Sequence, residues 1–239
     1  MIREWQEAFI LHQRPYGNTS VIAEVFTRNY GRVSVLARGA KNPKSKFFGY
    51  LTPFSKLKIM VSGRSDLKTL THIERDNYHF SESLSTHSFS LLYVNEIMMQ
   101  ILPQQAIAAE LFNLYENLME QIHQSFQLDH ILRAFELELL SILGYGINLK
   151  TEANSNQPIR ASLRYDFVPE FGFKQMDDGN FTGQDIIAIS KDDYGSINKE
   201  LFKHLTQTAL SFSLNAQLRS KKIFKSIAVS YTHLTLPTI

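Results

Sequence analysis

Cations and aromatic residues follow one another closely in a short segment near the N-terminus. Four cations fall within nine residues: Arg38, Lys41, Lys44 and Lys46. Three aromatic residues come just after them: Phe47, Phe48 and Tyr50. Lysine and arginine side chains bind phosphate groups, and an aromatic ring that stacks on a nucleobase contributes about 1–3 kcal/mol. This combination favours a surface that binds single-stranded nucleic acid.

The alternative for the same segment is a solvated loop followed by buried phenylalanines. Phenylalanine is more often buried than exposed, so we expect Phe47, Phe48 and Phe54 to lie in a core. For the cations we favour a polyanion as ligand, because the basic excess extends beyond the loop. Four further basic residues of the same region can join them: Arg14, Arg32, Arg64 and Lys68.

Charge is unevenly distributed along the 239 residues of the chain. Residues 1–80 carry 13 Lys/Arg against 6 Asp/Glu, a net charge of +7, whereas residues 81–160 carry 3 against 9, a net charge of −6. Residues 161–239 are nearly balanced, with 9 against 8, so the total of +2 hides the asymmetry. A basic part joined to an acidic part indicates a protein that binds a polyanion with one part and proteins with the other.

Sequence signals of an enzyme are absent. The chain has no phosphate-binding glycine loop, no nucleophile elbow and no His-Glu-x-x-His motif. It also has no cysteine, which excludes disulfides, thiolate zinc sites and a cysteine nucleophile. We therefore expect no enzymatic activity, no cofactor and no bound metal. The start does not resemble a signal peptide, and no apolar stretch approaches the ~20 residues that span a bilayer, so we expect a cytoplasmic protein.

The basic region must be positioned by strands. Five short runs of β-type residues are separated by turn signals: 8–12, 20–26, 32–38, 57–61 and 67–73. Five short strands in about 75 residues fit a small closed or nearly closed barrel. An OB-fold and an SH3-like barrel both agree with this pattern, and periodicity does not separate them.

From Leu84 onward the apolar residues recur at helical spacing. Helices are expected over six segments: 84–102, 106–122, 128–143, 185–190, 197–214 and 218–226. A β-hairpin is expected within 157–178. The predicted fold class is therefore α+β and multidomain, an N-terminal small β-barrel followed by a mainly α-helical domain with a short hairpin insertion. The predicted domains are 1–80 and 81–229, and residues 230–239, uncharged and alternating Thr with Leu, are expected to be a non-native tail.

Two further basic features leave alternatives open. Arg133 is the only Lys or Arg between Arg75 and Lys150. It can form a salt bridge, with Asp129 four residues earlier as partner, or hold a carboxylate beside an apolar groove. A second basic cluster either extends the nucleic-acid surface or complements the dipole of a helix end: Arg219, Lys221, Lys222 and Lys225.

Several segments, in this order, resemble the bacterial recombination mediator family RecO. The resemblance rests on Ala8-Phe-Ile-Leu-His-Gln-Arg-Pro-Tyr-Gly-Asn-Thr-Ser20, Gly31-Arg-Val-Ser-Val-Leu-Ala-Arg-Gly-Ala-Lys41, Leu51-Thr-Pro-Phe54, Leu92-Tyr-Val-Asn-Glu-Ile97, Arg133-Ala-Phe-Glu-Leu-Glu-Leu-Leu140 and Gly144-Tyr-Gly146. It extends from about residue 1 to about residue 227 and stops at the terminal segment.

The resemblance implies an N-terminal OB-fold and a non-catalytic role in DNA repair and recombination. Members of the family bind single- and double-stranded DNA and anneal complementary strands in the cytoplasm, at the nucleoid. They bind the C-terminal tail of single-stranded DNA-binding protein, pair with RecR and help load RecA. Some members hold zinc through four cysteines after the Gly-Tyr-Gly segment, so in this chain residues 157–175 must be stabilised without that metal.

Site residues carried over from the family fall into two groups. The residues carried over to the DNA-binding barrel are Arg14, Arg32, Arg38, Lys41, Lys44 and Lys46. Arg64 and Lys68 join the expected DNA-binding residues because of the basic excess of the same region, and not through the resemblance. Arg133 matches the position expected to hold the acidic partner tail, with Leu111 as a groove residue. An RNA-binding OB-fold module without an annealing role is the alternative function, and a hydrolase acting on nucleic acid is a second one.

Overall fold

The computed structural model describes residues 4–75, 84–102, 108–124 and 128–214, and no side chains for 84–87, 123 and 124. The predicted helix 218–226, the basic cluster Arg219–Lys225 and the predicted tail 230–239 lie outside the described residues. The chain divides into two compact units at Phe112 and Asn113, each treated by itself below. The predicted domain boundary at residue 80 stays a prediction, because residues 76–83 also lie outside the described part.

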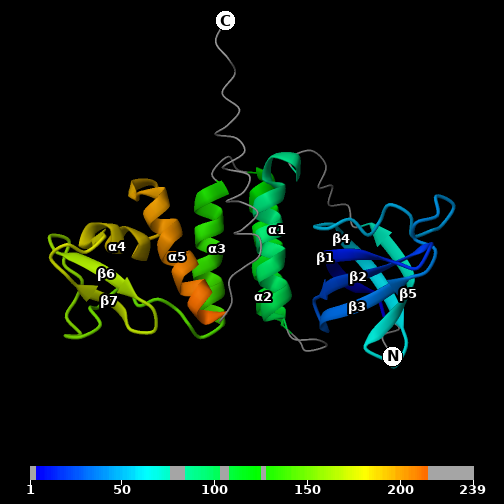
Figure 1. The fold of residues 1–239 in the computed structure, drawn as a ribbon, viewed down its shortest axis with the longest axis horizontal. Helices are drawn as coiled ribbons and strands as arrows, with labels where there is room; N and C mark the ends of the chain where they lie inside the picture. Colours follow the sequence, from blue (N-terminus) through cyan, green and yellow to red (C-terminus); the bar gives the residue numbers. More distant parts are fainter. Residues whose placement is uncertain (1–3, 76–83, 103–107, 125–127, 215–239) are drawn as a thin grey trace, which may run out of the picture. The chain divides into compact units, whose positions relative to one another are not determined.

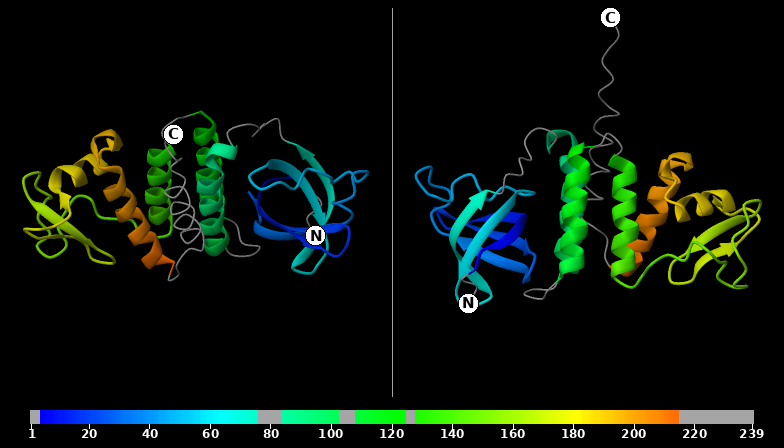
Figure 2. Two further views of the ribbon diagram at one scale, coloured as in Figure 1. Left: turned by 45° about the horizontal axis from the view of Figure 1, so that its top comes forward. Right: turned by 180° about the vertical axis from the view of Figure 1, so that it is seen from behind.

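Five strands of the first unit form a closed barrel (Figures 1 and 2). They are β1 (Gln6–Tyr16), β2 (Ser20–Thr27), β3 (Gly31–Ala37), β4 (Lys56–Ser62) and β5 (Leu67–Arg75). Their order is β1-β2-β3-β5-β4, with β1 pairing with β4 to close the barrel and only β3 and β5 running parallel. This is the OB-fold, so the predicted fold class is confirmed and the SH3-like alternative is wrong.

Strand directions place the connections at two opposite ends of the barrel. The β1–β2 turn and the β3–β4 loop, residues 38–55, lie at one end. The β2–β3 and β4–β5 turns lie at the other end. The lysine-rich β3–β4 loop therefore lies at the end of the barrel opposite the β2–β3 and β4–β5 turns.

The interior of the barrel is filled by alternate residues of the strands. In β3, Val33 and Val35 are buried in the core, whereas Arg32 and Ser34 point to the outer face. Three residues of the β3–β4 loop complete the same core from one end: Ala40, Phe47 and Leu51.

The outer face of the barrel carries helix α1 (Leu84–Ile101). The buried Asn95 side chain donates a hydrogen bond from Nδ2 to the carbonyl oxygen of Leu11 at 2.6 Å. Leu11 lies where the register of β1 shifts, and a bulge of this kind leaves a carbonyl free for a partner outside the sheet. From β3, Nη1 of Arg32 donates to the carbonyl oxygen of Met99 at 2.6 Å.

Phe112, near the start of α2 (Ala109–Gln124), adds an aromatic contact to the same face. Its ring lies 5.4 Å from the ring of Phe9 and 5.2 Å from that of Phe26, measured between centroids. The Arg28 guanidinium lies 4.4 Å above the Phe112 ring and pairs with Glu7 at 2.8 Å. Large buried rings of this kind contribute strongly to packing.

The second unit contains α3 (Leu128–Ile142), which packs against α5 (Lys199–Ser213), and a small sheet. The predicted hairpin is present as β6 (Arg164–Val168) and β7 (Gly172–Gln175). A third strand that the sequence did not predict, β8 (Phe181–Thr182), pairs with β6. Helix α4 (Gly183–Ser190) and the short 3-10 helix η1 (Tyr194–Ser196) follow.

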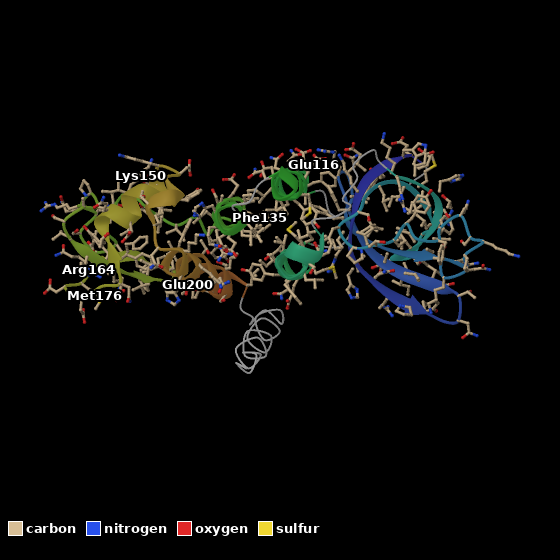
Figure 3. The ribbon with its side chains drawn as sticks, turned by 90° about the horizontal axis from the view of Figure 1, so that it is seen from above. Glu116, Phe135, Lys150, Arg164, Met176 and Glu200 are labelled. Atoms are coloured by element: carbon tan, nitrogen blue, oxygen red, sulfur yellow. The ribbon has the colours of Figure 1, made fainter. Side chains whose placement is uncertain are left out.

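Local signals explain several of these boundaries. Thr182 and Asp185 form a capping box that starts α4, since each side chain accepts a hydrogen bond from the backbone N–H of the other. Asn198 caps α5 by accepting from two backbone N–H groups of its first turn. At the sheet, Arg164 and Met176 lie together (Figure 3), and the Met176 N–H donates to the Arg164 carbonyl oxygen at 3.1 Å.

Among the described residues, no helix is long and apolar enough to cross a membrane.

Candidate nucleic-acid interface

The β3–β4 loop covers one end of the barrel and is fixed at both of its sides. Near its start, the Lys41 backbone N–H donates to the Thr19 carbonyl oxygen at 2.9 Å, and Lys41 Nζ donates to the Gly17 carbonyl oxygen at 3.2 Å. Farther along, Lys46 Nζ donates to the Thr71 carbonyl oxygen of β5 at 2.7 Å. The loop therefore spans from the β1–β2 turn to β5.

All four cations of this loop are exposed: Arg38, Lys41, Lys44 and Lys46. An ammonium group carries three N–H donors, so Lys41 and Lys46 keep two each after the bond to a carbonyl oxygen. Arg14 is exposed near the C-terminal end of β1, at the same end of the barrel. We call these five residues, Arg14 and the four loop cations, the basic cap.

The remaining predicted DNA-binding residues do not join the basic cap. Arg64 is exposed, but it lies in the β4–β5 turn at the opposite end of the barrel. Arg32 lies at the start of β3, half-buried, with its guanidinium bonded to α1. Lys68 is only 9% exposed, and its Nζ donates to the Ser65 carbonyl oxygen at 2.9 Å. The structure thus brings together five of the eight predicted cations.

The aromatic residues of the loop differ from one another in burial. Phe47 and Phe54 are buried, as predicted. The prediction for Phe48 is wrong, because its side chain is 48% exposed. Phe47 enters the barrel core, and its neighbour Phe48 consequently points away from it. Sequence analysis did not single out Tyr16, which is exposed two residues after Arg14, or Arg75, whose guanidinium lies 5.2 Å from the Tyr50 ring.

Arg133 of α3 is buried in the second unit and is only 5% exposed. Its partner is Glu136, at 2.8 Å between Nη2 and Oε1, and not the Asp129 that helical spacing also allowed. Glu136 is fully buried and also accepts a short hydrogen bond from Thr206 Oγ1 of α5. Asp129 instead lies 3.7 Å from Lys199.

A cleft of about 50 Å³ opens beside Arg133. Its lining combines three kinds of side chain, namely cations, carboxylates and apolar or aromatic groups: Asp129, His130, Arg133, Tyr194, Ile197, Lys199, Glu200, Phe202 and Lys203. The Arg133 Nε is buried and has no hydrogen-bond partner among the described residues. Burial and the neighbouring Asp192 carboxylate raise the pKa of Tyr194 above its ordinary value. Leu111, the predicted groove residue, is buried on α2 in the first unit.

The segment around residues 150–175 is held by hydrogen bonds and aromatic packing. The Glu152 carboxylate accepts from the Ser155 N–H at 2.5 Å, from Ser155 Oγ at 2.6 Å and from the Asn154 N–H at 3.0 Å. These bonds lower the pKa of Glu152 to about 2. The Phe173 ring packs between those of Phe167 and Phe181. No group of His, Cys, Asp and Glu suited to a metal ion occurs among the residues that the structure describes.

Comparison with known proteins covers both units. A family model described as recombination protein O N terminal matches residues 1–77, and one described as recombination protein O C terminal matches residues 86–175. The chain is 35% identical over 234 residues to DNA repair protein RecO of Actinobacillus pleuropneumoniae serotype 7 (strain AP76), with 95% of this chain and 97% of that protein covered. It is 34% identical over 231 residues to DNA repair protein RecO of Yersinia pestis (strain Pestoides F), with 94% and 95% covered.

Proposed function

The chain belongs to the RecO family of DNA repair proteins, and from this premise we propose that it acts as a recombination mediator. In this role it binds single- and double-stranded DNA, anneals complementary strands and helps load RecA on DNA that is coated with single-stranded DNA-binding protein. It pairs with RecR in the same process and performs no covalent chemistry itself. The observation that supports this proposal most directly is the exposed basic cap at one end of the barrel.

The basic cap suits a ligand without sequence preference. Its side chains are flexible and bind phosphates, which every DNA segment presents in the same way. For single strands each phosphate contact contributes about 0.7 to the slope of log affinity against log salt concentration, so five contacts give a slope of about −3.5. The acidic composition of residues 81–160 repels DNA and favours binding at the barrel.

The cleft beside Arg133 is the proposed site for the acidic tail of single-stranded DNA-binding protein. A carboxylate of the tail needs a fixed cation, and Glu136 holds Arg133 in one orientation. The buried Nε of Arg133 lacks a partner among the described residues. Lys203 adds a positive charge to the lining, whereas Lys199 is paired with Asp129. Phe202 and Ile197 supply the apolar part of the cleft.

The test is the annealing of two complementary oligonucleotides that are coated with single-stranded DNA-binding protein. The reaction is followed with and without this protein, in the absence of nucleotide and of added metal. Faster annealing supports the mediator role. No acceleration by a folded protein contradicts it and favours the RNA-binding alternative, which a preference for RNA over a DNA strand of matched sequence would then establish.

A further inference from the structure

Two exposed rings flank the basic cap. Tyr16 ends β1 and is 50% exposed, and Phe48 of the β3–β4 loop is 48% exposed. Because side chains alternate along a strand, Tyr16 shares a face with Arg14, and its neighbour Gly17 accepts the hydrogen bond from Lys41. Phe48 lies between Lys46, which is bonded to β5, and Gly49, whose carbonyl oxygen accepts from Arg75 Nη2 at 3.3 Å.

These two rings differ from the other aromatic side chains near the same surface. Phe47 lies under Lys46 Nζ at 5.1 Å, Tyr50 faces the Arg75 guanidinium, and Trp5 contacts His72 edge to face. Within the described residues, the rings of Tyr16 and Phe48 contact neither a cation nor another aromatic ring in this way. About half of each side chain is exposed, so both rings offer surface to a ligand.

The local backbone fixes the position of Phe48. Its N–H donates to the Ser45 carbonyl oxygen at 3.1 Å, and the buried Phe47 ring anchors the loop in the barrel core. Gly49 follows with a φ of +75°, a conformation that favours glycine and turns the chain back toward β5. A ring that is exposed on a fixed backbone loses little conformational freedom when a flat partner stacks on it.

We propose that Tyr16 and Phe48 are base-stacking residues and that they give the basic cap a preference for unpaired bases in single-stranded DNA. This inference rests on the proposed function and names two of the residues that carry it. Cations flank each ring, so phosphates on either side of a stacked base find a partner. In a duplex the base faces are already stacked on one another, so the rings add nothing to duplex binding.

The experiment measures the affinity of full-length variants for a labelled oligo-dT strand and for a blunt duplex by fluorescence anisotropy. Tyr16→Ala and Phe48→Ala are each expected to weaken binding of the single strand about 5- to 150-fold and to change duplex affinity less than about twofold. The salt dependence of single-strand binding is expected to stay as in the wild type, because no phosphate contact is removed. Phe48→Trp and Tyr16→Phe keep a ring and are expected to bind the single strand like the wild type.

Phe171→Ala is the matched control, since it removes a ring that is 63% exposed in the second unit. It is expected to leave both affinities unchanged. Unchanged single-strand affinity in the two alanine variants, beside a wild type that binds, overturns the inference and leaves the proposed function standing. An equal loss on strand and duplex, or the same loss in Phe171→Ala, overturns it as well. A wild type that binds neither DNA overturns the proposed function itself.

Discussion

The salt dependence of DNA binding tests the basic cap most directly. Lys41, Lys44 and Lys46 are exposed, so replacing all three by alanine removes three of the proposed phosphate ligands without opening the core. The two hydrogen bonds that are lost, to the Gly17 and Thr71 carbonyl oxygens, are exposed and contribute about 0.5–1.5 kcal/mol each. The contact of Lys46 with the Phe47 ring, also lost, contributes about 0.5–1 kcal/mol. The triple variant is therefore expected to fold.

The magnitude follows from counting contacts. With all five cations on phosphates the slope of log affinity against log salt is about −3.5, and with Arg14 and Arg38 alone it is about −1.4. Between about 50 mM and about 200 mM salt, the affinity of the wild type should then fall about a hundredfold and that of the variant about sevenfold. Fluorescence anisotropy with a single strand at four or more salt concentrations measures both slopes.

A second triple variant separates the position of the charges from their number. Lys58, Lys150 and Lys191 are exposed and lie outside the basic cap, so replacing them by alanine lowers the net charge by the same amount. This control is expected to keep the wild-type slope. The same slope in wild type and in the folded basic-cap variant refutes the placement of the DNA on the loop, and an equal change in the control refutes it too.

Three further outcomes are expected. Arg133→Ala should weaken binding of an acidic tail peptide of single-stranded DNA-binding protein by about tenfold or more, about 1.4 kcal/mol, and spare naked DNA. Because it also leaves Glu136 buried without its ion-pair partner, the double variant Arg133→Met/Glu136→Gln is measured beside it, and retained peptide affinity there would make Arg133 purely structural. Glu152→Gln should lower the free energy of unfolding at neutral pH by about 1–3 kcal/mol. Since the folded-state pKa of about 2 lies below the ordinary 4.5, this contribution is complete above pH 4.5 and is lost as the pH falls toward 2, so urea titrations of the two proteins should converge there. Gly183→Ala should destabilise by about 1–3 kcal/mol or more, because a Cβ would lie 1.9 Å from a backbone carbonyl oxygen, whereas Gly195→Ala, with no atom closer than 3.9 Å, should unfold like the wild type.

Strand positions could be predicted where alternation was regular. The run that became β3 alternates apolar and polar residues, and its pairing with β2 continues without a shift. The end of β1 was missed, because Pro15 and Gly17 indicated a turn from Arg14 onward. Proline has no backbone N–H and is tolerated where a strand has an unpaired edge. β4 pairs with residues 6–9 of β1 and does not reach Pro15, so the strand can extend to Tyr16 without losing a hydrogen bond to β4.

The details of the two candidate sites depended on contacts between distant segments. Phe47 and Phe48 are identical in type and adjacent, and only the path of the loop decides which of them enters the core. Similarly, Asp129 and Glu136 both lie within helical reach of Arg133. The hydrogen bond from Thr206, about seventy residues later, fixes Glu136 as the partner, and no local pattern contains that information.

The position of α1 restricts how the barrel can bind a strand. The outer face of β1 and β3 is used for packing, with Asn95 bonded to β1 and Arg32 bonded to Met99. The basic cap is therefore the part of the described barrel where exposed cations are concentrated. In the complex that we propose, lysine and arginine of this surface bind phosphates, and Tyr16 and Phe48 bind base faces. Stacking uses the face of a base and leaves its Watson–Crick edge free. A strand held in this way stays able to pair with a complement, whereas a protein that read base edges would block the pairing that annealing requires.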